Sequence, residues 1–313
     1  MKDYILSSVY YYSMKDSHIY DFRLDVDFPE RIDKLLSIYF PEYSRSTIQK
    51  WIRNKDILVN GKFCLQKDKI SESCDVSINV RTKPSINLIP ENIDIDIIDE
   101  TDDYIIVNKK SGVVTHIAPG NYTGTLQNGL YFKYPELSEV PRSGIIHRLD
   151  KDTSGVFIMA KHRESAQLLT SLFRLRKVHK TYLAICHGEL NTDSGEWNDD
   201  LIRYDGDKKI IEKAKTIYKV LDKNSEASLV ELKPITGRKH QLRKQLYALG
   251  QPIFGDIKYK LSNSSRGLNK NLMLHSYQIK FIIDDVKHTY TALLPDYFRK
   301  LLKTKRLRFS GLK

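Results

Sequence analysis

Residues 146–160 read IHRLDKDTSGVFIMA, and this stretch says more about the chain than any other. Its last five residues, Val156 to Ala160, are uniformly apolar, which is typical of a buried strand. The residues before them place Asp150 between Arg148 and Lys151 and then predict a turn. We therefore expect a charged cluster at the mouth of a sheet. A carboxylate beside two cations is favoured in its charged form, in which it can act as a nucleophile or a base.

A cluster of this kind can also be purely structural, because salt bridges at a strand end need not carry any chemistry. The catalytic loop of protein kinases also begins with His-Arg, but its aspartate follows directly, whereas Leu149 intervenes here. The glycine-rich loop and the Asp-Phe-Gly triplet of kinases are missing as well. The rest of the chain has to decide between a salt-bridge cluster and a catalytic site.

Length and composition are those of a globular protein. With 313 residues the chain suggests two domains, and its hydrophobic content of 41% is ordinary. No apolar stretch is long enough to span a membrane, and Met1–Tyr4 lacks the pattern of a signal peptide. The three cysteines form no C-x-x-C pair, which favours a reducing compartment and disfavours a structural zinc site. We expect a cytoplasmic protein.

The charge balance and the missing motifs narrow the function. No H-E-x-x-H motif, P-loop or dinucleotide-binding glycine fingerprint is present, so a reaction without a cofactor or metal is favoured among enzymes. The formal net charge of +12 favours a polyanionic partner such as nucleic acid, although a generic basic surface is the alternative. The basic residues form two clusters, one of Arg174, Arg176, Lys177, His179 and Lys180, and one of Arg299, Lys300, Lys303, Lys305, Arg306 and Arg308.

The region after residue 30 predicts a compact module of two helices and a hairpin. Apolar residues at helical spacing indicate one helix from Arg31 to Phe40, ended by Pro41. Ser44 or Ser46 can cap a second helix. The segment ILVNGK at 57–62 then predicts a strand that runs into an Asn-Gly hairpin turn.

This order, with RIDK at 31–34, SRS at 44–46 and VNGK at 59–62, resembles the S4-type RNA-binding domain first described in a ribosomal small-subunit protein. The resemblance implies that basic residues of the second helix and the hairpin contact RNA phosphates. The alternative is that these residues only form the solvated faces of an amphipathic helix pair. They are Arg45, Lys50, Arg53, Lys55 and Lys62.

Beyond this module, the segment 81–90 contains Pro84, Ser85 and Pro90 and predicts a linker. Residues 1–20 have no clear period and can form an arm or a first strand. We therefore expect an N-terminal arm over 1–20, an RNA-binding domain over 21–80, a linker over 81–90, and a larger domain with a basic tail over 91–313. In the larger domain strands are predicted at 103–108, 156–160, 180–185 and 228–232, helices at 125–131, 163–173 and 240–249, and a mobile loop at 261–270.

Several segments of the larger domain resemble one known family when taken in order. They are VNKKSGVVTH at 107–116, IHRLDKDTSG at 146–155, KTY at 180–182, TGRKHQLR at 236–243 leading into Gly255-Asp256, and LMLH at 272–275. Together they resemble the RluA/RluC/RluD family of pseudouridine synthases over nearly everything from Arg31 to about Pro295. The resemblance implies an α+β fold, in which a mixed, mostly antiparallel sheet is flanked by helices. Lys244-Gln245 and Lys258-Tyr259-Lys260 depart from the family's pattern and leave the subfamily and RNA target open.

The resemblance also implies roles at the catalytic centre. Asp150 would attack the ribose anomeric carbon, or take a proton from the neighbouring ribose carbon. Tyr182 would stack on the uracil and is a candidate base for the final deprotonation. Arg243 would pair with Asp150, stabilise its charge and fix its rotamer. The alternatives are core packing for Tyr182 and a surface position on an amphipathic helix for Arg243.

Four further residues are expected around the substrate. Arg148 would fill the space left in the RNA when the target base is extruded. Leu274 would line the uracil pocket, and Arg238 is a further candidate for substrate binding. His147 is expected to position the loop rather than to transfer protons.

The function implied is the conversion of specific uridines to pseudouridine in structured RNA by a monomer. The appended RNA-binding module favours large-subunit (23S) ribosomal RNA over transfer RNA. Two alternatives stay open: a non-catalytic RNA-binding or ribosome-assembly factor, and an RNA N-glycosidase that releases uracil. No cofactor or metal is expected, because the reaction is an isomerisation.

Overall fold

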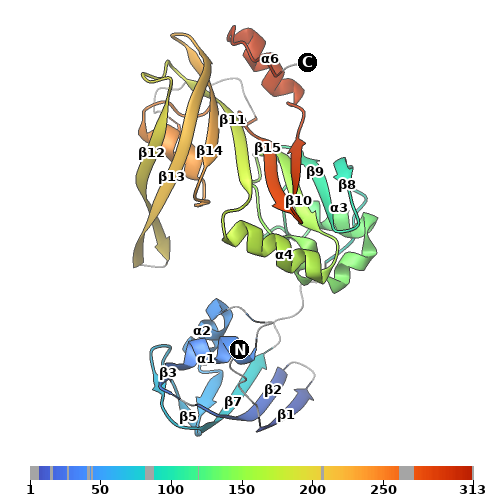
Figure 1. Cartoon of the computed structure of the whole chain (residues 1–313), viewed down its shortest axis with the longest axis vertical. Coiled ribbons are helices and arrows are strands. Elements are labelled where there is room, and N and C mark those ends of the chain that lie inside the picture. The colour runs from blue at the N-terminus through green and yellow to red at the C-terminus, as the bar shows by residue number, and fades with distance from the viewer. Residues whose placement is uncertain are drawn as a thin grey trace. The chain divides into compact units, whose positions relative to one another are not determined.

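The structure, a computed structural model, describes residues 7–14, 17–26, 28–40, 43, 45–81, 88–118, 120–205, 208–260 and 271–311. The chain divides into two compact units, Met1–Asn87 and Leu88–Lys313, which we call the N-terminal unit and the C-terminal unit (Figure 1). The predicted loop at 261–270, most of the predicted linker, and the predicted helix signals Pro41 and Ser44 lie outside the described residues.

The N-terminal unit has two helices packed on an antiparallel sheet of strand order β1-β2-β7-β4-β5, with a small β3–β6 ribbon beside it. The predicted helices and hairpin are confirmed, and Asn60 and Gly61 have the positive φ angles, 47° and 72°, that an Asn-Gly hairpin turn needs. Ser46 lies inside the second helix rather than before it. The elements are β1 Ser7–Met14, β2 Ser17–Leu24, β3 Glu30–Arg31, α1 Ile32–Tyr39, α2 Arg45–Arg53, β4 Ile57–Val59, β5 Lys62–Phe63, β6 Lys69–Ile70 and β7 Cys74–Arg81.

The C-terminal unit is built on a nine-stranded sheet of order β12-β13-β14-β11-β15-β10-β9-β8, with β16 paired to β15. Its strands pair antiparallel except for a short parallel contact between β10 and β15, so the expected mixed, mostly antiparallel sheet is confirmed. The strands are β8 Asp96–Glu100, β9 Tyr104–Lys109, β10 Ser154–Ala160, β11 His179–His187, β12 Ser194–Asp205, β13 Lys208–Lys223, β14 Ala227–Pro234, β15 Leu274–Ile283 and β16 Val286–Thr291.

Helices cover this sheet at four places, and the helices predicted from the sequence are confirmed. Thr125 caps α3 by accepting a hydrogen bond from the backbone N–H of Asn128. The helices are α3 Leu126–Lys133, α4 Arg163–Arg174, α5 Gln241–Ala248 and α6 Asp296–Thr304, and two 3-10 turns, η1 Pro135–Glu139 and η2 Pro141–Gly144, precede β10. None of the helices in the described ranges is long and apolar enough to cross a membrane.

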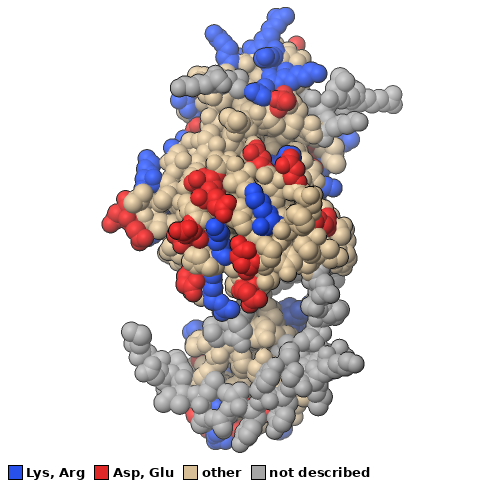
Figure 2. All heavy atoms as spheres, turned by 90° about the vertical axis from the view of Figure 1, so that its right-hand side faces the viewer, with Lys and Arg blue, Asp and Glu red and all other residues tan. Residues whose placement is uncertain are grey.

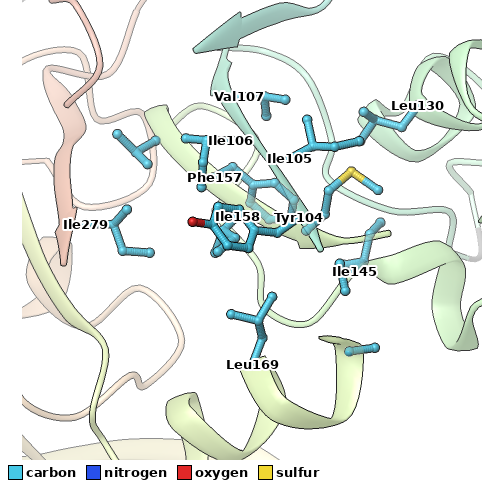
Figure 3. Packing of buried hydrophobic residues seen from close by; sticks show 14 of the residues in the cluster. Tyr104, Ile105, Ile106, Val107, Leu130, Ile145, Phe157, Ile158, Leu169 and Ile279 are labelled. Atoms are coloured by element: carbon cyan, nitrogen blue, oxygen red, sulfur yellow. The ribbon is translucent and has the colours of Figure 1, made fainter. Parts of the chain in front are cut away.

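Two hydrophobic cores meet at β11. The first lies around β9, β10, α3 and α4, where Phe157 and Ile158 of β10 pack among Ile105, Ile106 and Leu169 (Figure 3). The second lies around β11, β14, α5 and α6. Because Tyr182 packs against both cores, it stands where the two halves of the sheet join.

A close backbone approach fixes the start of β10 against β15. Gly155 has a φ of +110°, and a Cβ atom at this position would lie 2.1 Å from the carbonyl oxygen of Ser276. No other residue fits there without moving one of the strands. Asp150, five residues earlier, is therefore attached to a fixed strand end.

Candidate active site

Asp150 lies in the turn before β10, and two side chains from the α5 region face it. Its carboxylate lies 3.7 Å from Nη1 of Arg243 and 3.7 Å from Nε2 of His240. The Asp150 side chain keeps 21% of its surface exposed, whereas Arg243 keeps only 7%. The site therefore presents a carboxylate to solvent on one side and backs it with a buried cation on the other.

The backbone on both sides of Asp150 is held by hydrogen bonds to successive carbonyl oxygens. Such support limits how far the carboxylate can drift from a productive position. The carbonyl oxygen of Leu149 accepts from Thr115 Oγ1 (2.9 Å), that of Asp150 from Thr153 N (3.1 Å), that of Lys151 from Gly112 N (3.0 Å) and Lys109 Nζ (2.9 Å), and that of Asp152 from Ser111 Oγ (2.8 Å).

Lys109 is a buried cation beneath this turn, with 2% of its surface exposed. Its ammonium donates to the carbonyl oxygens of Lys110, Val113 and Lys151 at 2.8–3.0 Å. Burial lowers the pKa of Lys109 to about 7, and the more distant charges of Asp152 and Asp150 oppose that shift. The side chain thus ties the turn after β9 to the turn that carries Asp150.

Replacing Lys109 with methionine is expected to change how stability depends on pH. The folded chain gives up this proton near pH 7 and the unfolded chain near 10.5, so the unfolded state binds more protons between these values. Lys109 therefore contributes a rise of the free energy of unfolding with pH across that window, so the change between pH 7 and pH 9 should be more positive in the wild type than in Lys109→Met. Urea titrations of both proteins at pH 7 and pH 9 measure the free energy of unfolding at each pH. Equal rises would show that Lys109 stays charged in the folded protein.

Arg243 lies closer to a second carboxylate, that of Asp256, than to the carboxylate of Asp150. Its Nε and Nη2 donate to the two oxygens of Asp256 at 2.7 and 2.8 Å, and the Asp256 side chain is fully buried. Burial lowers the pKa of Arg243, but Asp256 and Asp150 outweigh burial and raise it overall. Asp256 also accepts from the backbone N–H groups of Lys258 and Tyr259, so it is a fixed anchor. It leaves Nη1 of Arg243 facing Asp150.

His240 and Tyr259 complete this side of the site. His240 stands before α5 in a left-handed conformation (φ 55°), and its Nδ1 lies 3.0 Å from the hydroxyl of Tyr259. The Tyr259 ring lies 5.2 Å from the guanidinium of Arg243, a cation–π contact. Burial lowers the pKa of His240, with Asp150 opposing. His240, which stands in the segment 236–243 quoted for the resemblance, thus lies beside the carboxylate.

Tyr182 lies on β11, where its ring packs against both hydrophobic cores. Burial raises its pKa to about 12, with a hydrogen bond to Ser276 opposing and Asp150 adding to the rise. The phenol therefore keeps its proton at neutral pH. A protonated phenol does not act as a base in the free protein, and the stacking role of Tyr182 stays a prediction.

His147 and Arg148 precede the turn and point to different surroundings. His147 stacks between the rings of Phe157 and Phe173, at 4.3 and 4.7 Å, and accepts a hydrogen bond from Ile158 N. Burial lowers the pKa of His147 to about 3, so the ring is neutral and suited to positioning. The Arg148 side chain is exposed, and no carboxylate of the described ranges pairs with it.

The structure gives less direct support to the two other predicted substrate contacts, Leu274 and Arg238. Leu274 begins β15, is 4% exposed and belongs to the second hydrophobic core. Arg238 donates to the carbonyl oxygen of Lys213 at 3.0 Å and lies 3.8 Å from Glu212, so it is bound to β13. The structure therefore brings two side chains to Asp150, that of Arg243, which was predicted to pair with it, and that of His240.

The five RNA-binding candidates of the N-terminal unit all have exposed side chains. One of them, Arg45, is held by Asp33, a fully buried carboxylate that also binds Arg31 and Gln49. Nothing in the segment RIDK at 31–34 predicts this role of Asp33. Two half-exposed guanidinium groups are thus fixed side by side on this unit.

Sequence reasoning missed two residues of the site, Asp256 and Lys109. Both stand in segments quoted for the resemblance, but nothing in their spacing predicts that one binds Arg243 and the other supports the Asp150 turn. The only available signal for Lys109 was a lysine at the end of an otherwise apolar strand.

Comparison with known proteins gives a consistent result. A model of the RNA pseudouridylate synthase family matches residues 103–248, and one of the S4 domain matches residues 30–76. The chain is 33% identical over 295 residues to ribosomal large subunit pseudouridine synthase D of Neisseria meningitidis, covering 88% of this chain and 79% of that protein.

Two further similarities agree. The chain is 35% identical over 239 residues to an uncharacterized RNA pseudouridine synthase of Bacillus subtilis, covering 74% of this chain and 79% of that one. Among solved structures, human RNA pseudouridylate synthase domain containing 4 aligns with a TM-score of 0.55 and 27% identity, over 68% of this chain and 94% of that chain.

Proposed function

The chain belongs to the RNA pseudouridylate synthase family, and on this premise we propose that it modifies uridines of large-subunit ribosomal RNA with Asp150 as nucleophile. The enzyme is an isomerase. The observation that carries the catalytic assignment is the geometry of Asp150. Its backbone is held on both sides, and its carboxylate faces the buried guanidinium of Arg243.

In the proposed reaction a carboxylate oxygen of Asp150 bonds to the ribose anomeric carbon as the bond to uracil N1 breaks. The uracil leaves with the electron pair, turns while it is held against Tyr182, and its C5 then attacks the same carbon. Asp150 is released unchanged, C5 loses its proton to a base, and N1 takes up a proton, so the product is an isomer of the substrate. Arg243, whose Nη1 lies 3.7 Å from the carboxylate, orients it. The reaction neither oxidises nor hydrolyses, so the proposal includes no cofactor and no metal.

The choice of large-subunit ribosomal RNA is supported by the relatives and by the basic surfaces. Curated relatives at 32–34% identity carry the name ribosomal large subunit pseudouridine synthase D. Lys and Arg also gather at the end of the C-terminal unit where α6 lies, whereas Asp and Glu gather lower on the face shown (Figures 1 and 2). The exposed cations of this region include Arg299, Lys300, Lys303 and Arg306.

We further propose that the enzyme works as a monomer in the cytoplasm, where the free cysteines stay reduced. Chemical mapping of pseudouridine across ribosomal and transfer RNA, in cells with and without the protein, tests the target. Loss of signal at large-subunit sites is expected. Loss at transfer RNA sites alone would redirect the proposal. An unchanged map would favour a non-catalytic assembly factor, and abasic sites in primer extension would favour a glycosidase.

Deleting residues 1–87 is expected to leave a folded enzyme that binds long RNA less tightly. The two units have separate hydrophobic cores, and the division falls after Asn87. Each lost phosphate contact should lower the slope of log K against log salt by about 0.9 if the rule for duplex DNA transfers. Short substrates should be modified nearly as fast as before. Equal affinity and equal salt slope on long RNA would make the N-terminal unit a protein-binding or stabilising element instead.

A further inference from the structure

A buried chain of hydrogen bonds connects α6 with the first residue of β10. The hydroxyl of Ser154 lies 2.9 Å from Nδ1 of His275 on β15 and 2.9 Å from the hydroxyl of Tyr297 on α6. Nε2 of His275 lies 3.3 Å from the carbonyl oxygen of Ala292. Ser154 is 3% exposed and His275 is fully buried, so water cannot replace these partners.

The partners fix the direction of every bond in this chain. Burial lowers the pKa of His275 to about 4, so at neutral pH the ring carries a single N–H. The carbonyl oxygen of Ala292 can only accept, which places that proton on Nε2. Nδ1 must then accept from Ser154, and the Ser154 oxygen is left to accept from Tyr297. Removing one member leaves a buried polar atom without its partner.

This chain ends next to the turn that carries Asp150. Ser154 follows the turn directly, and the turn is closed by the hydrogen bond from Thr153 N to the carbonyl oxygen of Asp150. Ser111 supports the same turn from another side by donating to the carbonyl oxygen of Asp152. Tyr297 thus reaches the support of the turn through Ser154.

We propose that Tyr297 and His275 are positioning residues that hold the Asp150 turn in its reactive position through Ser154. The inference rests on the proposed role of Asp150. His275 lies in a segment quoted for the resemblance, whereas Tyr297 lies on α6, beyond the residues 103–248 that the family model matches and beyond the resemblance that ends near Pro295. A displacement of about 1 Å at a nucleophile can cost up to about 100-fold in rate.

The test compares Tyr297→Phe with Tyr290→Phe, which removes the hydroxyl that lies 2.9 Å from Tyr104 in a cluster on β9 and β16. Single-turnover rate at saturating enzyme, RNA affinity and melting temperature are measured for both. Tyr297→Phe should slow the chemical step by about tenfold with unchanged RNA affinity. Tyr290→Phe should leave the rate unchanged. Equal rates for wild type and Tyr297→Phe, or equal losses in both variants, would overturn the proposal.

A second pair of variants separates positioning from packing. His275→Leu removes both hydrogen bonds, whereas His275→Asn keeps an acceptor where Nδ1 stood, so Asn should recover part of the rate that Leu loses. Equal rates in the two would contradict the proposal.

Hydrogen exchange of the Thr153 amide supplies a readout that needs no activity. It should speed up in Tyr297→Phe and stay unchanged in Tyr290→Phe. If the wild type made no pseudouridine, the proposed function would fail and this exchange would still decide whether Tyr297 holds the turn. Unchanged exchange in Tyr297→Phe would overturn the inference.

Discussion

Asp150→Asn is expected to abolish pseudouridine formation while RNA affinity stays within several-fold of wild type. An amide cannot form the bond to the anomeric carbon, and removal of a nucleophile in comparable enzymes costs about 10⁴-fold or more in rate. Binding depends mainly on basic side chains and should persist. The substitution is nearly isosteric, so the hydrogen-bonded backbone around it should not move. Single-turnover assays on a defined RNA, with affinity measured separately, give both values.

Asp152→Asn is the matched control, because it removes a carboxylate from the same turn without touching the proposed nucleophile. This variant should lose far less activity. Normal turnover by Asp150→Asn would remove Asp150 from the mechanism. A comparable loss in both variants would indicate that the charge of the turn matters more than one carboxylate.

Arg243→Leu is expected to have the second largest effect, acting on both stability and rate. It leaves Asp256 fully buried without its cation, and breaking such a pair commonly costs about 3–5 kcal/mol. It also removes the charge that faces Asp150 at 3.7 Å. Urea titration measures the first effect, and single-turnover rate on the folded fraction measures the second.

Arg243→Lys and Asp256→Asn separate these two effects. Lysine keeps a charge near Asp150 but cannot form the two parallel bonds to Asp256, so an intermediate rate is expected. Asp256→Asn keeps Arg243 but loosens its anchor, and it should lower the rate without removing any group that faces the substrate. A near-normal rate in folded Arg243→Leu would show that the guanidinium is peripheral.

The sequence predicted those parts of the fold that follow from local patterns. The apolar run of β10, the helix periodicity of α4 and the Asn-Gly hairpin each depend on a few neighbouring residues. The proximity of Arg243 to Asp150 came from resemblance alone, because 93 residues separate them and no local rule joins them.

What the sequence could not predict are contacts made between distant segments. Arg238 and Arg243 stand in one short segment, yet one binds β13 and the other Asp256. Lys109 is buried because three carbonyl oxygens from two turns converge on it, which no pattern within β9 reveals. Which group a charged side chain binds depends on the geometry of the loops around it rather than on its residue type.

The parallel contact between β10 and β15 has a consequence for the synthesis and folding of the enzyme. Ser154 and His275 are 121 positions apart, so β9 and β10 are both made while β15, the other neighbour of β10, is still missing. At about 5–20 residues per second, a ribosome needs roughly six seconds or longer to travel between the two. Throughout that interval the nascent chain already contains Asp150 but not the strand that locks its turn. An enzyme built in this way becomes active only late in synthesis, after most of its chain has already left the ribosome.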